Sequence, residues 1–523
     1  MSDTPPIRQA TALTVALNGL DASLVRVEVD CARGLPCFNI VGLPEACVRE
    51  SRTRVRAALR HLDIELNEHA VTVNLAPADL KKSGSAFDVA IACAVLGALG
   101  VIPKDSLDGI VMLGELSISG EVRRVRGVLP ALIGAGMQTC KSALVPHANA
   151  AEARSIGGLR VHVANHILEV AAHFRGQTLP EAKDVPQTTS IAPADIGDFS
   201  EVRGQFAARR ALEIAAAGHH NVLMMGPPGT GKTMLARRLP SILPPMTEAE
   251  ALEVTSIHSL AGLLPVSHGL VEQRPFRAPH HTASAAALFG GGSTVRPGEI
   301  TLAHNGCLFL DELLEFQRHV IDGMRQPLEE GSVTISRARY SATFPSRSLL
   351  VAAVNPCPCG YHGTKGVRAC RCSPEKVSRY RSRLSGPILD RIDLHVGLAP
   401  VSMEDLSGGT VGESSSAIRQ RVVAARARQR ERFSENRTSK AYNGELSGTD
   451  LERTAPLCAA SKRLIERAMS TMGLSARAYV RLRRVSRTLA DLRGDEHVSI
   501  DDVAEAIAGR ALDRDSDTLR LAS

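Results

Sequence analysis

A glycine-rich segment near the middle of the chain has the composition of a phosphate-binding loop. It follows the apolar run Asn221 to Met225 and matches the pattern GxxxxGK[ST]. Glycines in such a loop let backbone N–H groups surround phosphate oxygens at the start of a helix. The lysine reaches the β- and γ-phosphates, and the hydroxyl binds Mg²⁺. The sequence therefore predicts an ATP site formed by Gly226, Pro227, Pro228, Gly229, Thr230, Gly231, Lys232 and Thr233.

Polar side chains follow two further apolar runs. Cys307 to Leu310 ends in the acidic pair Asp311-Glu312, and Leu349 to Val354 ends in Asn355. An isolated acidic pair after a strand is commonly a solvated turn, but a phosphate-binding loop needs an acidic partner. We expect Asp311 to hold Mg²⁺ and Glu312 to orient and polarise the attacking water. Asn355, at a strand end facing the ligand crevice, is expected to sense the γ-phosphate.

The elements that position these residues belong to several domains, because 523 residues exceed the size of a single hydrophobic core. Residues 1–175 alternate short strands and helices, which predicts a mixed α+β domain. Residues 176–197 include a stretch rich in Pro, Thr and Gln and are predicted to be a linker. In residues 198–400 apolar strands alternate with helices, the α/β pattern of a parallel sheet. Residues 401–448 are predicted to form a basic linker helix and residues 449–523 a helical domain, with Asp450, Ser475 and Ser499 as N-caps.

No segment of the sequence has the pattern of a membrane anchor or a secretory signal. The longest apolar run, Val89 to Ile102, has 14 residues interrupted by Gly97 and Gly100. This length is too short to cross a bilayer and predicts a buried helix. Met1 to Ala12 lacks a basic region followed by an apolar one. We therefore expect a cytoplasmic protein with reduced thiols and no membrane partner.

Basic charge is concentrated in one segment. The net charge is +7, and Arg419 to Lys440 holds eight basic residues against two acidic ones. The chain has no Trp and only 3% aromatic residues, so any nucleic acid is expected to be contacted through its phosphates. Arg419, Arg426 and Arg430 share one face of a predicted helix. A solvated linker helix is the alternative interpretation of this segment.

Four of the eleven cysteines fall within sixteen residues: Cys357, Cys359, Cys370 and Cys372. A reducing compartment argues against disulfides, so a Cys₄ zinc site is one interpretation, with His362 as a spare ligand. Small buried apolar side chains or reactive thiols are the other interpretations.

Taken together, these motifs resemble AAA+ ATPases of the magnesium-chelatase-like group. The phosphate-binding loop, Asp311-Glu312 and Asn355 contribute to the resemblance, together with the run Ser385 to Leu394 and Ser475-Ala476-Arg477. More narrowly, the chain resembles the YifB/ComM proteins over essentially its full length. The narrower resemblance depends on three short motifs, Pro275 to His281, Gly290 to Gly292 and Asn355 to Gly360.

The resemblance implies roles for residues outside the loop. Arg391 would be the arginine finger, Arg477 the second sensor, and Gln205 would lie near the adenine. From the residues alone, Arg391 could equally form a surface salt bridge. ComM-type members are hexameric DNA motors that drive branch migration during recombination of transforming DNA. We therefore expect a homo-hexamer, with single-stranded or branched DNA as the partner.

Two segments are expected to face the pore of such a ring. The long irregular segment Pro275 to Asn305 would be an inserted loop, and Val333 to Phe344 would be a hairpin carrying Arg337 and Arg339. His280 and His281 lie within the inserted loop, and we expect them to be ordinary loop histidines because no third metal ligand is apparent.

The first domain resembles the protease domain of Lon, which has the ribosomal protein S5 domain 2-like fold. The resemblance depends on Lys82 to Phe87, with Ser85 near the nucleophile position, and on Gly114 to Glu121. A serine nucleophile of this kind needs a basic partner, yet Glu121 to Cys140 contains no lysine. The resemblance therefore implies the fold without protease activity, serving to dock a protein or DNA.

Two other functions share this pattern of motifs. One is the ATPase subunit of a chelatase that inserts Mg²⁺ into a tetrapyrrole, and the other is a MoxR-like chaperone that remodels proteins. The fused first domain and the cysteine-rich loop favour a ComM-type protein over a chelatase subunit. DNA-stimulated ATP hydrolysis would distinguish the DNA motor from both.

Overall fold

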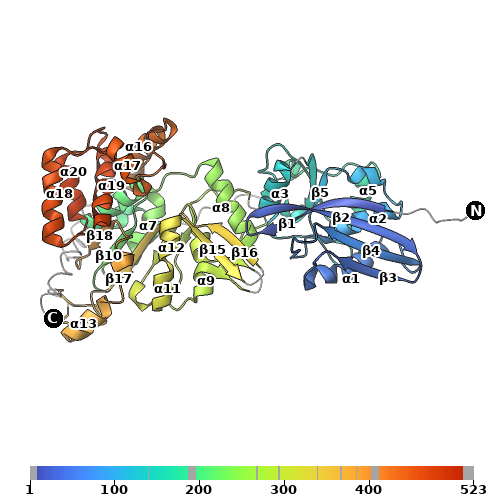
Figure 1. Ribbon diagram of the computed structural model, residues 1–523, viewed down its shortest axis with the longest axis horizontal. Helices are drawn as coiled ribbons and strands as arrows, with labels where there is room; N and C mark the ends of the chain where they lie inside the picture. The colour runs from blue at the N-terminus through green and yellow to red at the C-terminus, as the bar shows by residue number, and fades with distance from the viewer. Residues whose placement is uncertain are drawn as a thin grey trace, which may run out of the picture.

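The computed structural model describes residues 9–138, 140–186, 196–266, 269–292, 295–337, 340–364, 368–384, 386–401 and 412–510. Three parts follow one another along the long axis of the molecule: an N-terminal domain, a central domain and a group of C-terminal helices (Figure 1). None of the helices in the described ranges is both long and apolar enough to span a bilayer.

The N-terminal domain is a mixed sheet covered by helices. Seven strands lie in the order β3-β4-β2-β1-β5-β8-β9. They are β1 (Gln9–Asn18), β2 (Asp21–Arg33), β3 (Cys37–Val41), β4 (His69–Ala76), β5 (Ile110–Met112), β8 (Ser142–Pro146) and β9 (Arg160–Ala164). Antiparallel pairs join β1, β2 and β4, while the β3–β4 pair and the pairs from β1 through β5 and β8 to β9 are parallel. A separate small ribbon pairs β6 (Glu115–Leu116) with β7 (Val122–Arg123).

Helices of this domain bury the apolar runs of the sequence. The helices are α1 (Ala46–Arg60), α2 (Asp88–Ala98), α3 (Val128–Met137), α4 (Ala150–Ala153) and α5 (Ile167–Phe174). All eleven residues of α2 are buried, which confirms the buried helix predicted from the run starting at Val89.

The domain extends further along the chain than its composition indicates. Leu179 and Ala182 are buried in its core, and the backbone N–H of Val163 donates to the carbonyl of Pro180 at 3.0 Å. The first part of the predicted linker is therefore packed structure instead. The remainder of the predicted linker includes residues 187–195, which lie outside the described ranges.

The central domain is built on a parallel sheet, as its alternating pattern predicts. The strands are β10 (Val222–Met225), β11 (Phe276–Arg277), β14 (Cys307–Leu310), β17 (Leu349–Val354) and β18 (Leu394–Gly397). They lie in the order β11-β14-β17-β10-β18, with every adjacent pair parallel. Parallel strands all end at one edge of the sheet, so the polar residues that follow β10, β14 and β17 gather there.

Helices and insertions surround this sheet. The three longest helices are α6 (Phe206–Gly218), α7 (Lys232–Ile242) and α8 (Glu248–Ala261). The segment between α8 and β14 contains α9 (Ala285–Phe289), the short pair β12 (Gly290–Gly291) and β13 (Arg296–Pro297), and α10 (Glu299–Leu302). After β14 come α11 (Arg318–Gly323), α12 (Arg325–Glu330) and the hairpin of β15 (Ser332–Arg337) with β16 (Tyr340–Pro345).

The predicted hairpin is thus present, and it touches the N-terminal domain. An added Cβ at Gly19, in the turn between β1 and β2, would lie 3.3 Å from Cβ of Ala342 on β16. Arg339 and the side chain of Arg337 lie outside the described part of the chain.

A second contact joins the N-terminal domain to α8. The hydroxyl of Ser259 on α8 donates to the carboxylate of Glu152 at 2.5 Å, and Arg124 donates to the carbonyl of Leu264 at 2.6 Å. Burial raises the pKa of Glu152, although its hydrogen bonds with Ser259 and Asn149 oppose the shift. The interface between the two domains therefore contains a nearly inaccessible carboxyl group.

Residues 412–510 are helical. The helices are α16 (Ser415–Ser434), α17 (Gly448–Thr454), α18 (Ala459–Met472), α19 (Ala476–Arg493) and α20 (Ile500–Ala508). Ser475 and Ser499 cap α19 and α20 as predicted. The prediction that Asp450 is an N-cap is wrong: Ser447 caps α17, and Asp450 is the third residue of that helix, in a capping box with Ser447.

The basic helix α16 is packed against α6, and its arginines are not all exposed. Arg426 is 5% exposed and donates to the carbonyl of Ala216 at 3.1 and 2.9 Å. Arg432 forms an ion pair with the buried Asp491. Arg426 therefore does not reach solvent together with Arg419 and Arg430, although the three were predicted to share one face of the helix, because its guanidinium donates to the carbonyl end of α6.

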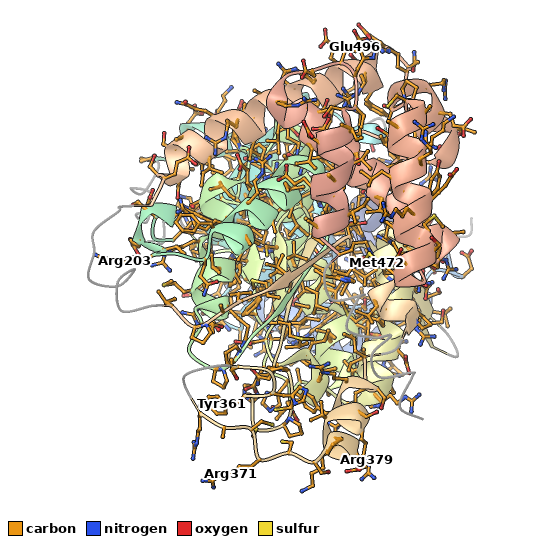
Figure 2. The ribbon with its side chains drawn as sticks, turned by 90° about the vertical axis from the view of Figure 1, so that its left-hand side faces the viewer. Arg203, Tyr361, Arg371, Arg379, Met472 and Glu496 are labelled. Carbon is orange, nitrogen blue, oxygen red and sulfur yellow. The ribbon has the colours of Figure 1, made fainter. Side chains whose placement is uncertain are left out.

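Helix α13 (Pro374–Arg381) and short α14 (Gly386–Leu389) lie between β17 and β18. The loop before α13, with Tyr361 and Arg371, lies at the opposite end of the view from Glu496 in the turn after α19 (Figure 2).

Candidate nucleotide-binding site

The glycine-rich loop connects β10 to α7 with the backbone shape that its sequence predicts. Gly229 and Gly231 have φ of 79° and 87°, and Gly231 is the N-cap of α7. Such values favour glycine over residues with a Cβ. An added Cβ at Gly226 would lie 2.7 Å from the carbonyl oxygen of Leu398. The loop can therefore expose its backbone N–H groups at the start of a helix.

Lys232 lies folded under this loop. Its ammonium donates to the carbonyls of Gly226 at 2.5 Å and Pro227 at 3.0 Å, and to Oδ1 of Asn355 at 3.1 Å. Burial lowers the pKa of Lys232, opposed by Asp311 and Glu312. A buried cation held by neutral carbonyls is incompletely compensated, so an anionic phosphate would be a better partner.

Thr233 and Asp311 face each other across the neighbouring strand end. The Thr233 hydroxyl donates to Oδ2 of Asp311 at 2.7 Å. A hydroxyl and a carboxylate oxygen at this separation are hard oxygen donors of the kind that Mg²⁺ prefers. The residues present thus fit the magnesium ion expected from the sequence.

Glu312 lies at the rim of a cavity of about 340 Å³ beside Thr233 and Asp311. Its backbone has φ of 51°, a left-handed conformation that is uncommon for a residue with a side chain. Nδ1 of His281 lies 3.2 Å from Oε2 of Glu312. The carboxylate is half-exposed and is therefore held by the histidine rather than by packing.

His281 is a site residue that the sequence analysis did not identify. We expected His280 and His281 to be ordinary loop histidines, and His280 does hydrogen-bond within the loop, to Thr282 at 2.8 Å. The sequence contained one indication of this contact, the motif Pro275 to His281. A distinct motif within a long insertion indicates that the insertion contacts another segment of the chain. The partner, thirty-one positions along the chain, could not be read from spacing.

Gln205 adjoins the loop from the side of α6. Its amide donates to the carbonyls of Ala399 at 2.7 Å and Thr230 at 3.2 Å. It is the N-cap of α6, with φ of 50°. Gln205 therefore joins the phosphate-binding loop to the end of β18, the region in which the adenine was expected.

Arg391 and Arg477 lie together elsewhere. Both line a cavity of about 510 Å³ that, among the described residues, shares no lining residue with the cavity at Glu312. Arg391 is buried, donating to the carbonyl of Pro387 at 2.5 Å and pairing with Glu329, whereas Arg477 is exposed. Hydrogen bonding and charge from Arg391, reinforced by Arg477, lower the pKa of Glu329. The structure thus brings these arginines together without placing them at the chain's own phosphate-binding loop.

An ion pair in the same cavity connects the sheet to α19. Nη1 of Arg481 lies 2.5 Å from Oδ1 of Asp393, just before β18. Burial alone would raise the pKa of the Asp393 carboxyl, but Arg481 and His220 hold it well below its usual range. The C-terminal helices are therefore fixed to the sheet by a buried charge as well as by apolar packing.

The four clustered cysteines are also brought together. Their sulfur atoms all lie within 4.8 Å of one another, in the loop after Asn355. Within the described residues the group contains only these four cysteines, so His362 is not part of it.

Three family descriptions match the chain, and together they extend over most of it. "Magnesium chelatase, subunit ChlI" matches residues 198–406, "Subunit ChlI of Mg-chelatase" matches residues 27–149, and "Magnesium chelatase, subunit ChlI C-terminal" matches residues 412–510. The matches correspond to the central domain, most of the N-terminal sheet and the C-terminal helices.

Curated relatives match at nearly full length. The "Competence protein ComM" of Haemophilus influenzae is 42% identical over 501 residues, covering 95% of this chain and 96% of that protein. The "Uncharacterized protein YifB" of Escherichia coli is 41% identical over 505 residues, covering 96% and 97%. A "Magnesium-chelatase 38 kDa subunit" of Rhodobacter capsulatus is 25% identical over 198 residues, covering 34% of this chain and 56% of that subunit.

Proposed function

The chain belongs to the YifB/ComM family of magnesium-chelatase-like AAA+ ATPases, and we propose that it is a hexameric motor that hydrolyses ATP to move along DNA. The proposal extends to helicase or branch-migration activity in the recombination of transforming DNA. It is supported by a full-length relationship to a protein named for competence. The match to a chelatase subunit extends over only part of either chain, which favours the DNA motor over a chelatase.

The observation that carries the proposal is the meeting of Lys232, Asn355, Thr233 and Asp311 at one edge of the parallel sheet. Lys232 would leave its carbonyl partners for the β- and γ-phosphates, and Asn355 would then contact the γ-phosphate. Gln205, beside the loop, would border the adenine. These residues bind and orient ATP through positioning and charge, which dominate phosphoryl transfer.

Thr233 and Asp311 would hold Mg²⁺, which neutralises charge on the phosphates when bound. Glu312 would accept a hydrogen bond from the attacking water, which orients the water and polarises its O–H bond so that the oxygen becomes more nucleophilic. In the present structure the Glu312 carboxylate lies beside His281 instead. Release of that contact would free the carboxylate for the water.

We assign Arg391 and Arg477 to the nucleotide of a neighbouring chain. Both line one cavity away from the chain's own loop. An arginine that stabilises transition-state charge can be supplied by another subunit. Since the two arginines line one cavity, the neighbour's nucleotide would be completed by both, and each active site would need two chains.

DNA would be held mainly through phosphates in the ring's pore. The β15–β16 hairpin and the insertion before β14 are the segments proposed to face the pore. Arg337 and Arg339 in the hairpin would provide positive charge, and Arg419 and Arg430 on α16 are exposed. The buried Arg426 is excluded from any such contact.

The N-terminal domain would be a Lon-protease-like fold that docks a partner and has no protease activity. Lys82, the lysine nearest to Ser85 in the sequence, is buried and donates to the carbonyl of Pro77. Glu121 to Cys140, the segment that corresponds to the basic partner in the resemblance, contains no lysine.

ATP hydrolysis by the full chain, measured with and without DNA, tests the proposal. We expect single-stranded and branched DNA to increase the rate several-fold and Lys232→Ala to abolish it. A forked substrate with a radioactive strand would measure unwinding in parallel. Stimulation by an unfolded polypeptide but not by DNA would identify a protein-remodelling ATPase and overturn the proposal.

A further inference from the structure

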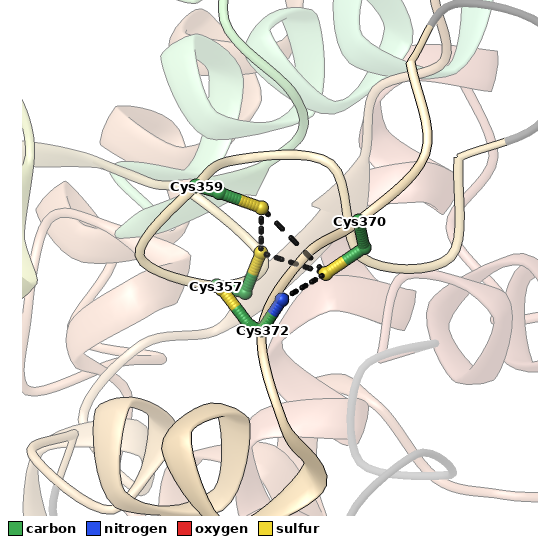
Figure 3. Close-up of side chains that lie close together, drawn as sticks. All are labelled: Cys357, Cys359, Cys370 and Cys372. Carbon is green, nitrogen blue, oxygen red and sulfur yellow. Dashed lines mark hydrogen bonds between the residues drawn. The ribbon is translucent and has the colours of Figure 1, made fainter.

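Four cysteine side chains converge on one point in the loop between β17 and α13 (Figure 3). The sulfur of Cys357 lies 3.3 Å from that of Cys359 and 3.7 Å from that of Cys370, and the Cys359 and Cys370 sulfurs are 3.6 Å apart. Cys372 completes the group, all of whose sulfurs lie within 4.8 Å of one another. The two C-x-C pairs therefore form a single compact cluster of thiols.

The spacing of these sulfurs matches one small ion at their centre. A tetrahedral zinc ion with bonds of about 2.3 Å to four thiolates separates the sulfurs by about 3.8 Å. All four residues are free cysteines, and Cys357 is buried. Hydrogen bonds among four thiols in contact are weak, because sulfur is a weak donor and a weak acceptor. A shared cation would satisfy all of them at once.

A backbone donor also holds one of the sulfurs in place. The backbone N–H of Cys372 points to the Cys370 sulfur at 3.4 Å. A backbone donor of this kind orients a sulfur toward a shared metal ion. Four thiolates leave no coordination position open for water, which is typical of a structural zinc site and not of a catalytic one.

We propose that Cys357, Cys359, Cys370 and Cys372 bind one Zn²⁺ ion per chain. Zinc is favoured because a tetrahedral set of four sulfurs suits an ion that is borderline soft and has no electronic preference of geometry. Binding releases a proton from each thiol as the zinc–sulfur bonds form, without any oxidation or reduction. This zinc site does not depend on whether the substrate of the ATPase is DNA.

The site lies against the phosphate-binding loop. The cysteine loop starts directly after the Asn355-Pro356 pair, and Asn355 accepts a hydrogen bond from Lys232 at 3.1 Å. An added Cβ at Gly360, whose φ is 86°, would lie 2.5 Å from Cδ of Pro228. The metal-bound loop therefore supports Pro228 from outside while fixing the end of β17. This second step of the proposal rests on the proposed nucleotide site.

Metal analysis of the purified full chain tests the site directly. We expect about one zinc per chain, falling below about one in ten chains in Cys370→Ser. Cys458→Ser is the matched control, because Cys458 is exposed on another domain and should leave the zinc content unchanged. A wild-type protein purified with iron or without metal, and unable to take up zinc after reduction, would overturn the proposal.

Cobalt substitution provides a second test that does not depend on whether a variant folds. Wild-type protein stripped of metal under reducing conditions and given Co²⁺ should show the absorption of tetrahedral cobalt thiolates. Added Zn²⁺ should displace it with an equivalence of one. The absence of that spectrum in metal-loaded protein would contradict a four-thiolate site.

Nucleotide affinity tests the coupling to the loop. Zinc-free wild-type protein should bind a fluorescent ATP analogue several-fold more weakly, with recovery on adding Zn²⁺. Unchanged affinity would retain the zinc site but overturn its role in supporting Pro228. If Lys232→Ala instead binds the analogue as tightly as the wild type does, the proposed nucleotide site is wrong. Failure of the nucleotide site and failure of its coupling to zinc can therefore be distinguished.

Discussion

Nδ1 of His281 lies 3.2 Å from Oε2 of Glu312, which joins the long insertion before β14 to the acidic pair after it. Because the insertion is proposed to face the DNA, this contact connects the DNA-facing segment with the residue that would act on water. We expect His281→Ala to raise ATP hydrolysis without DNA by a few-fold and to reduce the stimulation by DNA. His280→Ala is the matched control, since His280 bonds to Thr282. A lower rate with unchanged DNA stimulation in His281→Ala would contradict this role.

Substitutions of Lys232 and Glu312 should impair different steps of ATP hydrolysis. Lys232→Ala should lose nucleotide binding, because its ammonium is the cation nearest the phosphates. Glu312→Gln should still bind ATP but hydrolyse it about a hundredfold more slowly or worse, since only the orientation of water is impaired. Equilibrium binding of a fluorescent analogue and steady-state hydrolysis measure the two effects. An equal loss of nucleotide binding in both variants would contradict the separate roles assigned to Lys232 and Glu312.

Mixing experiments test where the arginines act. Lys232→Ala and Arg391→Ala chains should each be inactive alone. In an equimolar mixture about a quarter of interfaces pair an intact loop with an intact arginine, so some ATP hydrolysis should return. Differently tagged chains that co-purify show that mixed rings formed. No recovery in confirmed mixed rings would falsify the role of Arg391 in a neighbour's site.

The position of Arg477 allows a sharper version of this test. A mixture of Arg391→Ala and Arg477→Ala chains should show no recovery, because both arginines are supplied from the same side of an interface. If Arg477 instead acted on the nucleotide of its own chain, about a quarter of interfaces would be intact. Recovery in this mixture would therefore overturn the shared-surface assignment while leaving that of Arg391 in place.

DNA affinity should depend strongly on salt and weakly on sequence. Raising salt from about 50 to about 200 mM should weaken binding steeply, and loss of Arg337 or Arg339 should each lower the log–log slope by about one. Fluorescence anisotropy with labelled DNA measures both. Arg318→Ala, which removes an exposed arginine outside the proposed pore segments, is the control that should leave the slope unchanged. Binding that is insensitive to salt would favour a polypeptide substrate.

The Asp393–Arg481 pair should stabilise the joint between sheet and helices. Asp393→Ala should cost roughly 3 kcal/mol, because it leaves Arg481 without its buried partner. Since the pKa of Asp393 is depressed, its contribution is present above the ordinary value of about 4 and is lost as pH falls through the folded pKa. Urea denaturation at neutral pH measures the loss. Arg123→Ala, in an exposed pair with Glu121, should change the midpoint little.

Local patterns in the sequence were enough to predict that the glycine-rich loop meets the residues at the strand ends, but not what surrounds them. Lys232, Thr233, Asp311 and Asn355 could be placed together because each follows or begins an element whose period is visible, and parallel strands share one carboxyl edge. The contact of His281 with Glu312 depends on how a long insertion folds back, which no period reveals.

Burial of charge was the other property that the sequence did not reveal. The sequence places Arg426 on the polar face of a basic helix. In the structure its guanidinium donates to the carbonyl of Ala216 and lies over the Tyr442 ring, 4.1 Å from the ring centre. Long side chains can bury their apolar stems and still find acceptors, so periodicity alone does not place them outside. Asp450 shows a smaller error of the same kind, because a capping box has polar residues at both of its ends.

The packing of α16 and α19 against α6, which lies on the central sheet, limits where the chain can bend in the proposed ATP cycle. One apolar core runs from Phe199 through the sheet to Ile507, and the Asp393–Arg481 pair is embedded in the same junction. A hinge motion at this junction would separate Asp393 from Arg481 and leave each of these buried charges without the other. The central domain and the C-terminal helices would therefore turn together as one rigid body, and a ring of the proposed kind would change shape at the interfaces between chains. Two fluorophores within one chain, on α6 and α18, should keep their separation throughout hydrolysis, while a pair on adjacent chains should not.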